Sequence, residues 1–212
     1  MNLHTPCFPL LAVALLAFGP AKADMVGLPA CTFEGQPMSV DLSTSNPATP
    51  TTPTNWQVTG PGASGPTHTA DPAWTALQYY WIQPNLGPYP QFMPQGYYTY
   101  LIRFFIPCKP QNYAGLSLTG RIAADNSFKA YVNGNLFATC AGPNCFSYPG
   151  NPTTFANLAG YLVRGVNAIQ IVVYNRDTIT GLAVSATLTA RCGQECCQML
   201  RNLDMLHGTR PQ

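Results

Sequence analysis

The alternation of apolar and polar residues along the chain predicts short β-strands. The clearest run is 97–106, YYTYLIRFFI, and Pro107 ends it. Alternate side chains of a strand point to opposite faces of a sheet, so Arg103 falls on the face opposite the apolar residues. The residues predicted to share the apolar face are Tyr98, Tyr100, Ile102, Phe104 and Ile106.

Turn signals separate this run from other strand-like runs. Asn133-Gly134 is the strongest hairpin signal, and it joins 128–132 to a return strand at 135–138. Segments rich in Ser, Thr, Pro and Gly are expected to be loops rather than ladder strands. These loops are 43–54 and 59–73, with further loops at 83–95 and 175–181, and the remaining strands are expected at 56–58, 115–122, 168–174 and 182–190. Many short strands with turn signals predict a β-sandwich or barrel.

The last stretch of the chain has a helical period instead. Met199, Leu200, Leu203 and Leu206 recur at helical spacing, and Gly208 can end a helix. We therefore expect a short helix at 195–207, packed on the sandwich.

The N-terminal segment has the features of a signal peptide. Residues 8–18 form an uncharged apolar run, shorter than the roughly 20 residues that span a bilayer, and Ala21-Lys22-Ala23 follows it. We expect cleavage after Ala23 and secretion to an extracellular or periplasmic space; a buried N-terminal helix is the alternative. No second run reaches membrane length, so the mature chain is expected to have no membrane span. The expected organisation is a signal peptide at 1–23, a β-sandwich domain at 24–191 and a Cys-rich tail at 192–212 that includes the short helix.

Composition narrows the function classes. Charged residues make up only 8% of the chain and the formal net charge is +2, so nothing marks a nucleic-acid partner. Hydrophobic residues make up 46%, which is enough to build a core and argues against disorder. The 21 prolines and 18 glycines indicate a turn-rich chain rather than a helix bundle or a polytopic membrane protein.

The eight cysteines predict disulfides, because a secreted protein meets an oxidising compartment. Cleavage would remove Cys7 and leave seven. Gly142-Pro143 can turn the chain between Cys140 and Cys145, which makes that pair the first expectation. The other expected pairings are Cys31 with Cys192, and Cys108 with either Cys196 or Cys197. One thiol would then remain for an intermolecular bond and a disulfide-linked oligomer. A zinc site formed by Cys192, Cys196, Cys197 and His207 is the alternative.

Part of the chain resembles the galactose-binding-like jelly-roll domains of secreted bacterial proteins and carbohydrate-binding modules. The segments that carry the resemblance are 66–84, 96–107, 114–137 and 155–190. The motifs that carry the resemblance are Ala124-Asp125-Asn126, Val132-Asn133-Gly134, the hairpin from Leu162 through Asn175, and Gly181-Leu182. The resemblance covers about residues 55–190. It implies an all-β jelly-roll sandwich, here with a short C-terminal helix, whose loops at one end bind glycan. Such domains often hold a structural calcium, but acidic residues are sparse here, so no cofactor or metal is expected.

Glycan recognition uses aromatic faces together with polar groups that orient hydroxyls. On the loop at 83–95, Tyr89 and Phe92 are the expected stacking residues, while Trp81, Tyr98 and Tyr100 are expected in the core. The polar groups expected to contact a sugar are Arg121, Asp125 and Asn126 as a clamp, and Arg176 and Asp177 as a rim. The alternatives are turn chemistry for Asp125 and Asn126, and a solvated loop for Arg176 and Asp177.

An enzyme is not expected. After cleavage only His68 and His207 remain as histidines, and no nucleophile elbow, zinc-protease motif or phosphate-binding loop occurs. The first hypothesis is therefore a secreted, non-catalytic protein that binds a glycan or cell-surface polysaccharide. The second is a structural or surface-assembly protein that uses the jelly roll and an unpaired cysteine for protein contacts. A hydrolase with paired carboxylates is the third.

Overall fold

The computed structural model of the chain describes residues 25–44, 55–69, 81–84, 93–142, 145, 152–177 and 179–206. The predicted signal peptide, Tyr89, Phe92 and His207 lie outside the described residues.

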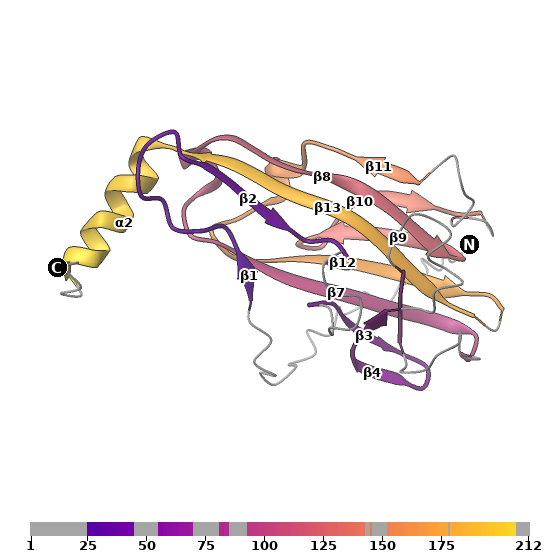
Figure 1. Cartoon of the computed structure of the whole chain (residues 1–212). Coiled ribbons are helices and arrows are strands. Elements are labelled where there is room, and N and C mark those ends of the chain that lie inside the picture. Colours follow the sequence, from indigo (N-terminus) through magenta and orange to yellow (C-terminus); the bar gives the residue numbers. More distant parts are fainter. Residues whose placement is uncertain are drawn as a thin grey trace, which may run out of the picture.

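The first of two sheets contains the strand at 96–106, which the sequence marks most clearly (Figure 1). Its order is β10-β9-β12-β7-β3-β4, with β1 beside β7. The bounds are β1 Val26–Gly27, β3 Gln57–Gly60, β4 Ala63–Pro66, β7 Gly96–Ile106, β9 Ser127–Val132, β10 Asn135–Cys140 and β12 Gly165–Asn175. All pairs are antiparallel except β1 with β7.

The second sheet has the order β11-β8-β13-β6-β5, and β2 also pairs with β13. Its strands are β2 Pro37–Asp41, β5 His68–Thr69, β6 Trp81–Gln83, β8 Tyr113–Asp125, β11 Thr153–Phe155 and β13 Gly181–Cys192. Two 3-10 turns, η1 Pro110–Asn112 and η2 Leu158–Tyr161, and the helix α2 Gln194–Leu206 complete the described elements. From β7 to β9 and from β10 to β13 the chain alternates between the two sheets, as the chain of a jelly roll does.

The predicted all-β sandwich is confirmed, and its core is the apolar face that alternation predicts. Tyr98, Tyr100, Phe104 and Ile106 of β7 are 0% exposed, and Trp81 is 2% exposed. The Tyr98 hydroxyl lies within hydrogen-bond distance of the carbonyl oxygens of Pro61 (3.0 Å) and Pro94 (2.8 Å). The polar tip of a buried ring is therefore satisfied at the edge of the core.

The Asn133-Gly134 turn is confirmed, and it does more than close a hairpin. Both residues have positive φ, 49° and 82°, as a two-residue turn between twisted strands requires. The Asn133 side chain donates to Asn167 Oδ1 (2.8 Å) and accepts from the Ala168 N–H (2.9 Å). Asn167 is 1% exposed and also accepts from the Val163 N–H (2.8 Å). Two of the resemblance motifs thus meet in one hydrogen-bond network.

The expectation that 59–73 contains no ladder strands is wrong. β3 continues to Gly60, and β4 and β5 follow within that segment. Proline and glycine are tolerated here because β4 and β5 are the last strands at the ends of their sheets, where one side has no ladder partner. The positive φ of Gly62 (70°) makes the turn between β3 and β4.

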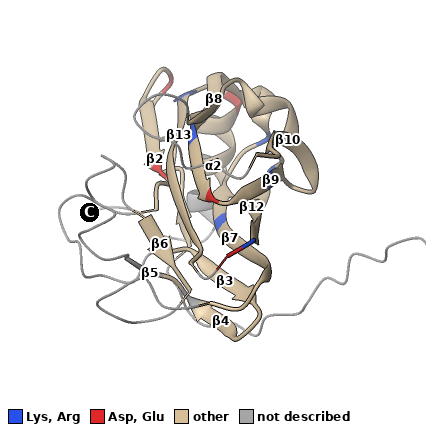
Figure 2. Ribbon diagram, turned by 90° about the vertical axis from the view of Figure 1, so that its right-hand side faces the viewer, with Lys and Arg blue, Asp and Glu red and all other residues tan. Residues whose placement is uncertain are grey.

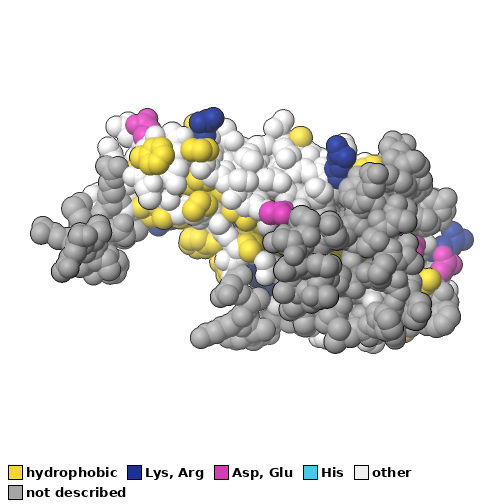
Figure 3. Space-filling view, in the orientation of Figure 1, with side chains coloured by type: hydrophobic (Ala, Val, Ile, Leu, Met, Phe, Trp, Pro, Cys, Tyr) yellow, Lys and Arg dark blue, Asp and Glu magenta, His cyan; other side chains and the backbone are white. Residues whose placement is uncertain are grey.

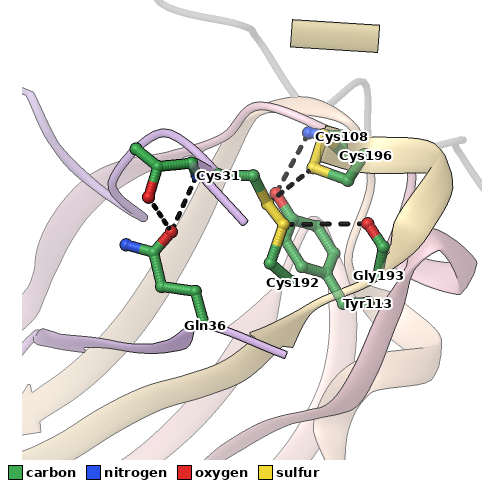
Figure 4. The surroundings of a disulfide bond; sticks show 8 residues. Cys31, Gln36, Cys108, Tyr113, Cys192, Gly193 and Cys196 are labelled. Atoms are coloured by element: carbon green, nitrogen blue, oxygen red, sulfur yellow. Dashed lines mark hydrogen bonds between the residues drawn. A yellow bond between two sulfur atoms is a disulfide. The ribbon is translucent and has the colours of Figure 1, made fainter. Parts of the chain in front are cut away.

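The described part of the chain contains three disulfides, and all join pairs that the sequence suggests. Cys31–Cys192 and Cys108–Cys196 lie side by side where α2 begins, with 3.1 Å between the Sγ atoms of Cys31 and Cys196 (Figure 4). The third disulfide, Cys140–Cys145, joins two cysteines that are 5 positions apart in the sequence. The zinc alternative is wrong, because two of its four ligands, Cys192 and Cys196, are bonded to other cysteines.

The predicted C-terminal helix is present as α2, and its beginning packs on the sandwich. Cys196 and Cys197 are buried, and Met199 and Leu200 are half-buried against the core. Figure 1 shows the remainder of α2 running away from the end of the sheets. Among the described residues, no helix has the length and apolar character to cross a bilayer.

Candidate functional site

The end of the sandwich opposite α2 brings together three of the predicted site residues. Asn126 Oδ1 accepts from the Arg176 N–H (2.7 Å), and its Nδ2 donates to Asp177 Oδ2 (3.3 Å). The peptide bond between Asp125 and Asn126 is cis. Because Asn126 is 4% exposed and both ends of its amide are engaged, it ties the β8–β9 turn to the loop after β12.

Asp125 ends β8 beside this cluster. The Thr180 hydroxyl donates to the Asp125 carbonyl oxygen (3.0 Å). Burial of the carboxyl group, and secondly the negative charge of Asp177, raise the pKa of Asp125 to about 6. Burial also raises the pKa of the nearby Tyr100 far above its ordinary value. Asp125, Asn126, Arg176 and Asp177 thus form an anchored polar corner in which the carboxyl group of Asp125 resists ionisation.

Arg121 is not brought to this corner. It lies exposed on the outer face of the second sheet, opposite Ser185 and Thr154. Arg121 lies four positions before Asp125 on β8, so their backbones are about 13 Å apart at the usual rise of a strand. The structure therefore does not place Arg121 in the hydrogen-bonded cluster with Asn126, and Tyr89 and Phe92 lie outside the described residues.

A groove on the outer face of the first sheet was not expected from the sequence. Its volume is about 440 Å³, and β7, β12, β9 and β10 form its floor. In register, Tyr174 pairs with Tyr97 on one side and with Ser127 on the other, and Lys129 pairs with both Val172 and Thr139. The groove is lined by Tyr97, Ser127, Phe128, Lys129, Tyr131, Thr139, Cys140, Ala141, Val172 and Tyr174.

Two tyrosine rings dominate this groove. The ring centroids of Tyr97 and Tyr174 lie 4.9 Å apart with an interplanar angle of 45°. Tyr97 is 67% exposed and Tyr174 is 36% exposed, although their chain neighbours Tyr98 and Val173 are 0% exposed. The alternation that buries Tyr98 also turns Tyr97 outward, so the signal for this site was present in the strand pattern rather than in a loop.

Polar side chains complete the lining. Ser127 and Thr139 supply hydroxyl groups, and Lys129 is exposed, with no ion pair to another described residue. The polar corner adjoins the groove through the chain itself, since Ser127 follows Asn126 and Arg176 stands two residues after Tyr174. The groove is therefore an aromatic surface edged by hydrogen-bonding groups, with Arg176 and Asp177 beyond one end.

Charged side chains are sparse elsewhere on the described surface. In the face shown in Figure 3 the few acidic and basic side chains are scattered, except for one of each kind that lie next to each other at the right edge.

Comparison with known proteins gives solved structures only, since no family model and no curated protein matches the chain. A protein assigned as a β-galactosidase from Bacteroides fragilis has 17% identity and a TM-score of 0.39, over 72% of this chain and 23% of that one. β-Glucuronidase 2 of Bacteroides uniformis has 16% identity and a TM-score of 0.39, over 72% and 18% of the two chains. A β-glucuronidase of Lactobacillus rhamnosus has 13% identity and a TM-score of 0.36, over 79% and 30%. The chain thus spans less than a third of the length of these enzymes, and what it binds has to be argued from its own residues.

Proposed function

We propose that the protein binds carbohydrate non-covalently, with the sugar rings lying on the tyrosine groove of the first sheet. The observation that supports this most is the exposed Tyr97–Tyr174 pair, because two adjoining rings form a larger continuous apolar surface than rings that are exposed singly, and such surfaces often mark binding sites. Sugar rings have an apolar face of C–H groups that can lie on an aromatic ring, while their hydroxyls need polar partners.

The polar lining fits the second requirement. The hydroxyls of Ser127 and Thr139 can each donate and accept, and the ammonium of Lys129 donates. A volume of about 440 Å³ lies within the usual range for small-ligand sites. The groove is open at the sheet surface, so a chain of sugars could continue beyond it.

Cross-strand aromatic pairs also stabilise sheets, by about 0.2–1 kcal/mol, and this is the alternative explanation of the tyrosine pair. The two explanations differ in what the exposed ring does. A purely structural pair gives a stability loss without a binding loss when Tyr97 is truncated, whereas a binding platform gives a loss of affinity larger than any loss of stability.

We propose binding without catalysis. The described residues that line the groove include no carboxylate and no histidine, so they hold no acid–base pair of the kind that glycoside hydrolysis uses. Asp125 and Asp177 stand at the polar corner, where Asp177 accepts a hydrogen bond from Asn126. We assign that corner a positioning role at the end of the groove, with Arg176 as the side chain that can reach a ligand.

Secretion is part of the proposal. Three disulfides are consistent with an oxidising compartment and hence with an extracellular or periplasmic protein. The glycan would then be one that the protein meets outside the cytoplasm, such as a cell-surface polysaccharide.

A glycan array followed by affinity electrophoresis tests the proposal. We expect Tyr97→Ala and Tyr174→Ala each to weaken binding of an array hit by about tenfold or more, which corresponds to about 1.4 kcal/mol. Tyr161→Ala is the matched control, since Tyr161 is 38% exposed but belongs to η2 and does not line the groove. Equal affinities for wild type and both groove variants would refute the site, and the absence of any array hit would refute the function.

A further inference from the structure

The charged side chains in the strands of the first sheet are all basic. None of its seven strands contains Asp or Glu, but β7 contains Arg103 and β9 contains Lys129. The second sheet is mixed, with acidic residues in β2 and β8 and arginines in β8 and β13. Figure 2 shows how few charged residues the ribbon has, so this separation by sheet is a feature of a sparsely charged molecule.

Both cations of the first sheet lie on its outer face. Lys129 is exposed between the buried residues Phe128 and Ala130, and Arg103 is half-buried between Ile102 and Phe104. Through the register, Lys129 aligns with Thr99 of β7, four residues before Arg103. At the usual strand rise and spacing the two backbones are about 13 Å apart along the strands and about 10 Å apart across them.

Lys129 is the cation that lies within the groove. It lines the groove together with Tyr97, Tyr131 and Tyr174, and no ion pair joins it to another described residue. An ammonium group in the lining of the groove, with no described counter-ion, has its charge available to a ligand. An ammonium group is a compact point charge that binds carboxylate or sulfate without a fixed geometry.

The nearest described acid at the groove end does not cancel this charge. Asp177 lies on the loop after β12, its Oδ2 accepts from Asn126, and its chain neighbour Arg176 offsets it. Asp125 and Asp177 both belong to the polar corner beyond the lining, and among the described residues that line the groove Lys129 is the one charged side chain, so the charge of the lining itself is positive.

From these observations we infer that the glycan is acidic: its sugars bear carboxylate or sulfate groups, and Lys129 is the residue that selects for them. This inference rests on the proposed function, because it names the class of carbohydrate for the same groove. Tyr97 and Tyr174 supply affinity for the rings, and Lys129 supplies the preference for charged over neutral glycans.

Pairs of polymers that differ only in charge test this preference with the full secreted chain. Polygalacturonate is compared with its methyl ester, and κ-carrageenan with its desulfated form, so that the two arms separate carboxylate from sulfate. We expect wild type to prefer the charged member of at least one pair by tenfold or more. Raising the salt from 0.1 M to 1 M should remove most of that preference, because the screening length falls from about 10 Å to about 3 Å.

The variants give the deciding comparison, with the charged-to-neutral affinity ratio as the readout. In Lys129→Gln the ratio should fall to about one or two, and in Lys129→Arg it should stay high, since the charge is kept. Lys109→Gln is the matched control, because Lys109 is exposed but stands before η1, outside the groove, and its variant should keep the wild-type ratio.

The two proposals fail in different ways. If neutral glycans bind in a Tyr97-dependent manner but wild type shows no charge preference in either arm, the acidic-glycan inference is overturned and the groove stands. A charge preference that survives in Lys129→Gln also overturns it. If Tyr97→Ala leaves both members of every pair bound as in wild type, the groove itself is refuted.

Discussion

Asp125 shows at the scale of one residue how the fold changes ordinary side-chain chemistry. Its carboxyl group has a pKa of about 6 in the folded protein, because burial and then Asp177 oppose its charge, against 3.8 in the absence of such effects. Above pH 6 the group is ionised in both folded and unfolded chains, and only the folded chain bears the cost. Below about pH 4 it is protonated in both, so this contribution makes the fold more stable as the pH falls from 6 to 4.

We therefore expect Asp125→Asn to stabilise the protein at pH 7.5 and to have little effect at pH 4. Because the side chain is partly exposed, the expected gain is about 1 kcal/mol after solvent screening is allowed for. Urea unfolding at the two pH values measures it, with Asp177→Asn as a smaller change in the same direction. An equal effect at both pH values, or a loss at pH 7.5, would contradict this account.

Tyr97 and Tyr98 show what could be predicted for single residues. Alternation along 97–106 separates an outward ring from an inward one, and the structure has them 67% and 0% exposed. What alternation could not supply is that Tyr174, 77 positions later in the sequence, would lie beside Tyr97, because that depends on the pairing of β12 with β7. The sequence predicts stacking residues on a loop, at Tyr89 and Phe92, and both lie outside the described residues. The tyrosine pair lies on the strands β7 and β12.

At the scale of elements, the β9–β10 hairpin and β12 are joined by asparagine side chains rather than by apolar packing alone. Asn167 donates to the carbonyl oxygens of Val163 (2.8 Å) and Gly165 (3.0 Å) and accepts from the N–H of Val163 and from Asn133 Nδ2. Every polar atom of this buried side chain therefore has a partner.

Asn167→Ala should lower the free energy of unfolding by about 2–4 kcal/mol, because it leaves several buried partners unsatisfied at once. Chemical denaturation measures the loss. Asn135→Ala is the matched control: Asn135 is exposed, its side chain donates over 3.3 Å to Val132 O and 3.4 Å to Asn133 O, and we expect a change of no more than about 0.5 kcal/mol. Similar losses of unfolding free energy in the two variants would show that the Asn167 network stabilises the fold no more than the exposed Asn135 side chain does.

The disulfides differ in the length of chain they close. Cys31–Cys192 spans 161 residues and Cys140–Cys145 spans 5. In the chain-entropy model these loops correspond to about 5 and about 2 kcal/mol. We expect the double variant Cys31→Ala/Cys192→Ala to lose clearly more stability than Cys140→Ala/Cys145→Ala in the same urea titration. A larger loss of stability in Cys140→Ala/Cys145→Ala would mean that the entropy of loop closure does not determine how much each disulfide stabilises the fold.

The elements that the sequence predicted well are those with a strong local pattern. β7, β8, β12 and β13 are long alternating runs, and the β9–β10 turn has its own signal in Asn133-Gly134. β1, β2 and β11 were not predicted, because they are 2–5 residues long and their pairing is set by distant partners. β2, for example, pairs with β13 from the other end of the chain.

At the scale of the whole molecule, the two ends of the sandwich have different constructions. One end is fastened by two adjacent disulfides at the start of α2, and the other ends in the polar corner beside the groove. Among the described cysteines Cys197 is unpaired, and it is 4% exposed. A thiol in that position is poorly placed to join a second molecule.

We therefore expect the protein to migrate as a monomer on non-reducing gels. Its thiol should react with a maleimide dye only after unfolding, because the Cys197 side chain is buried. Rapid labelling in the folded state, or a dimer that disappears on reduction and in Cys197→Ser, would instead support the surface-assembly hypothesis.

The claim on which the account depends most is that sugar rings lie on Tyr97 and Tyr174. Intermolecular nuclear Overhauser effects in a complex with the best-bound oligosaccharide test it directly. The account predicts contacts between sugar C–H protons and the ring protons of both tyrosines. Contacts confined to other aromatic side chains, with none to Tyr97 or Tyr174, would contradict it.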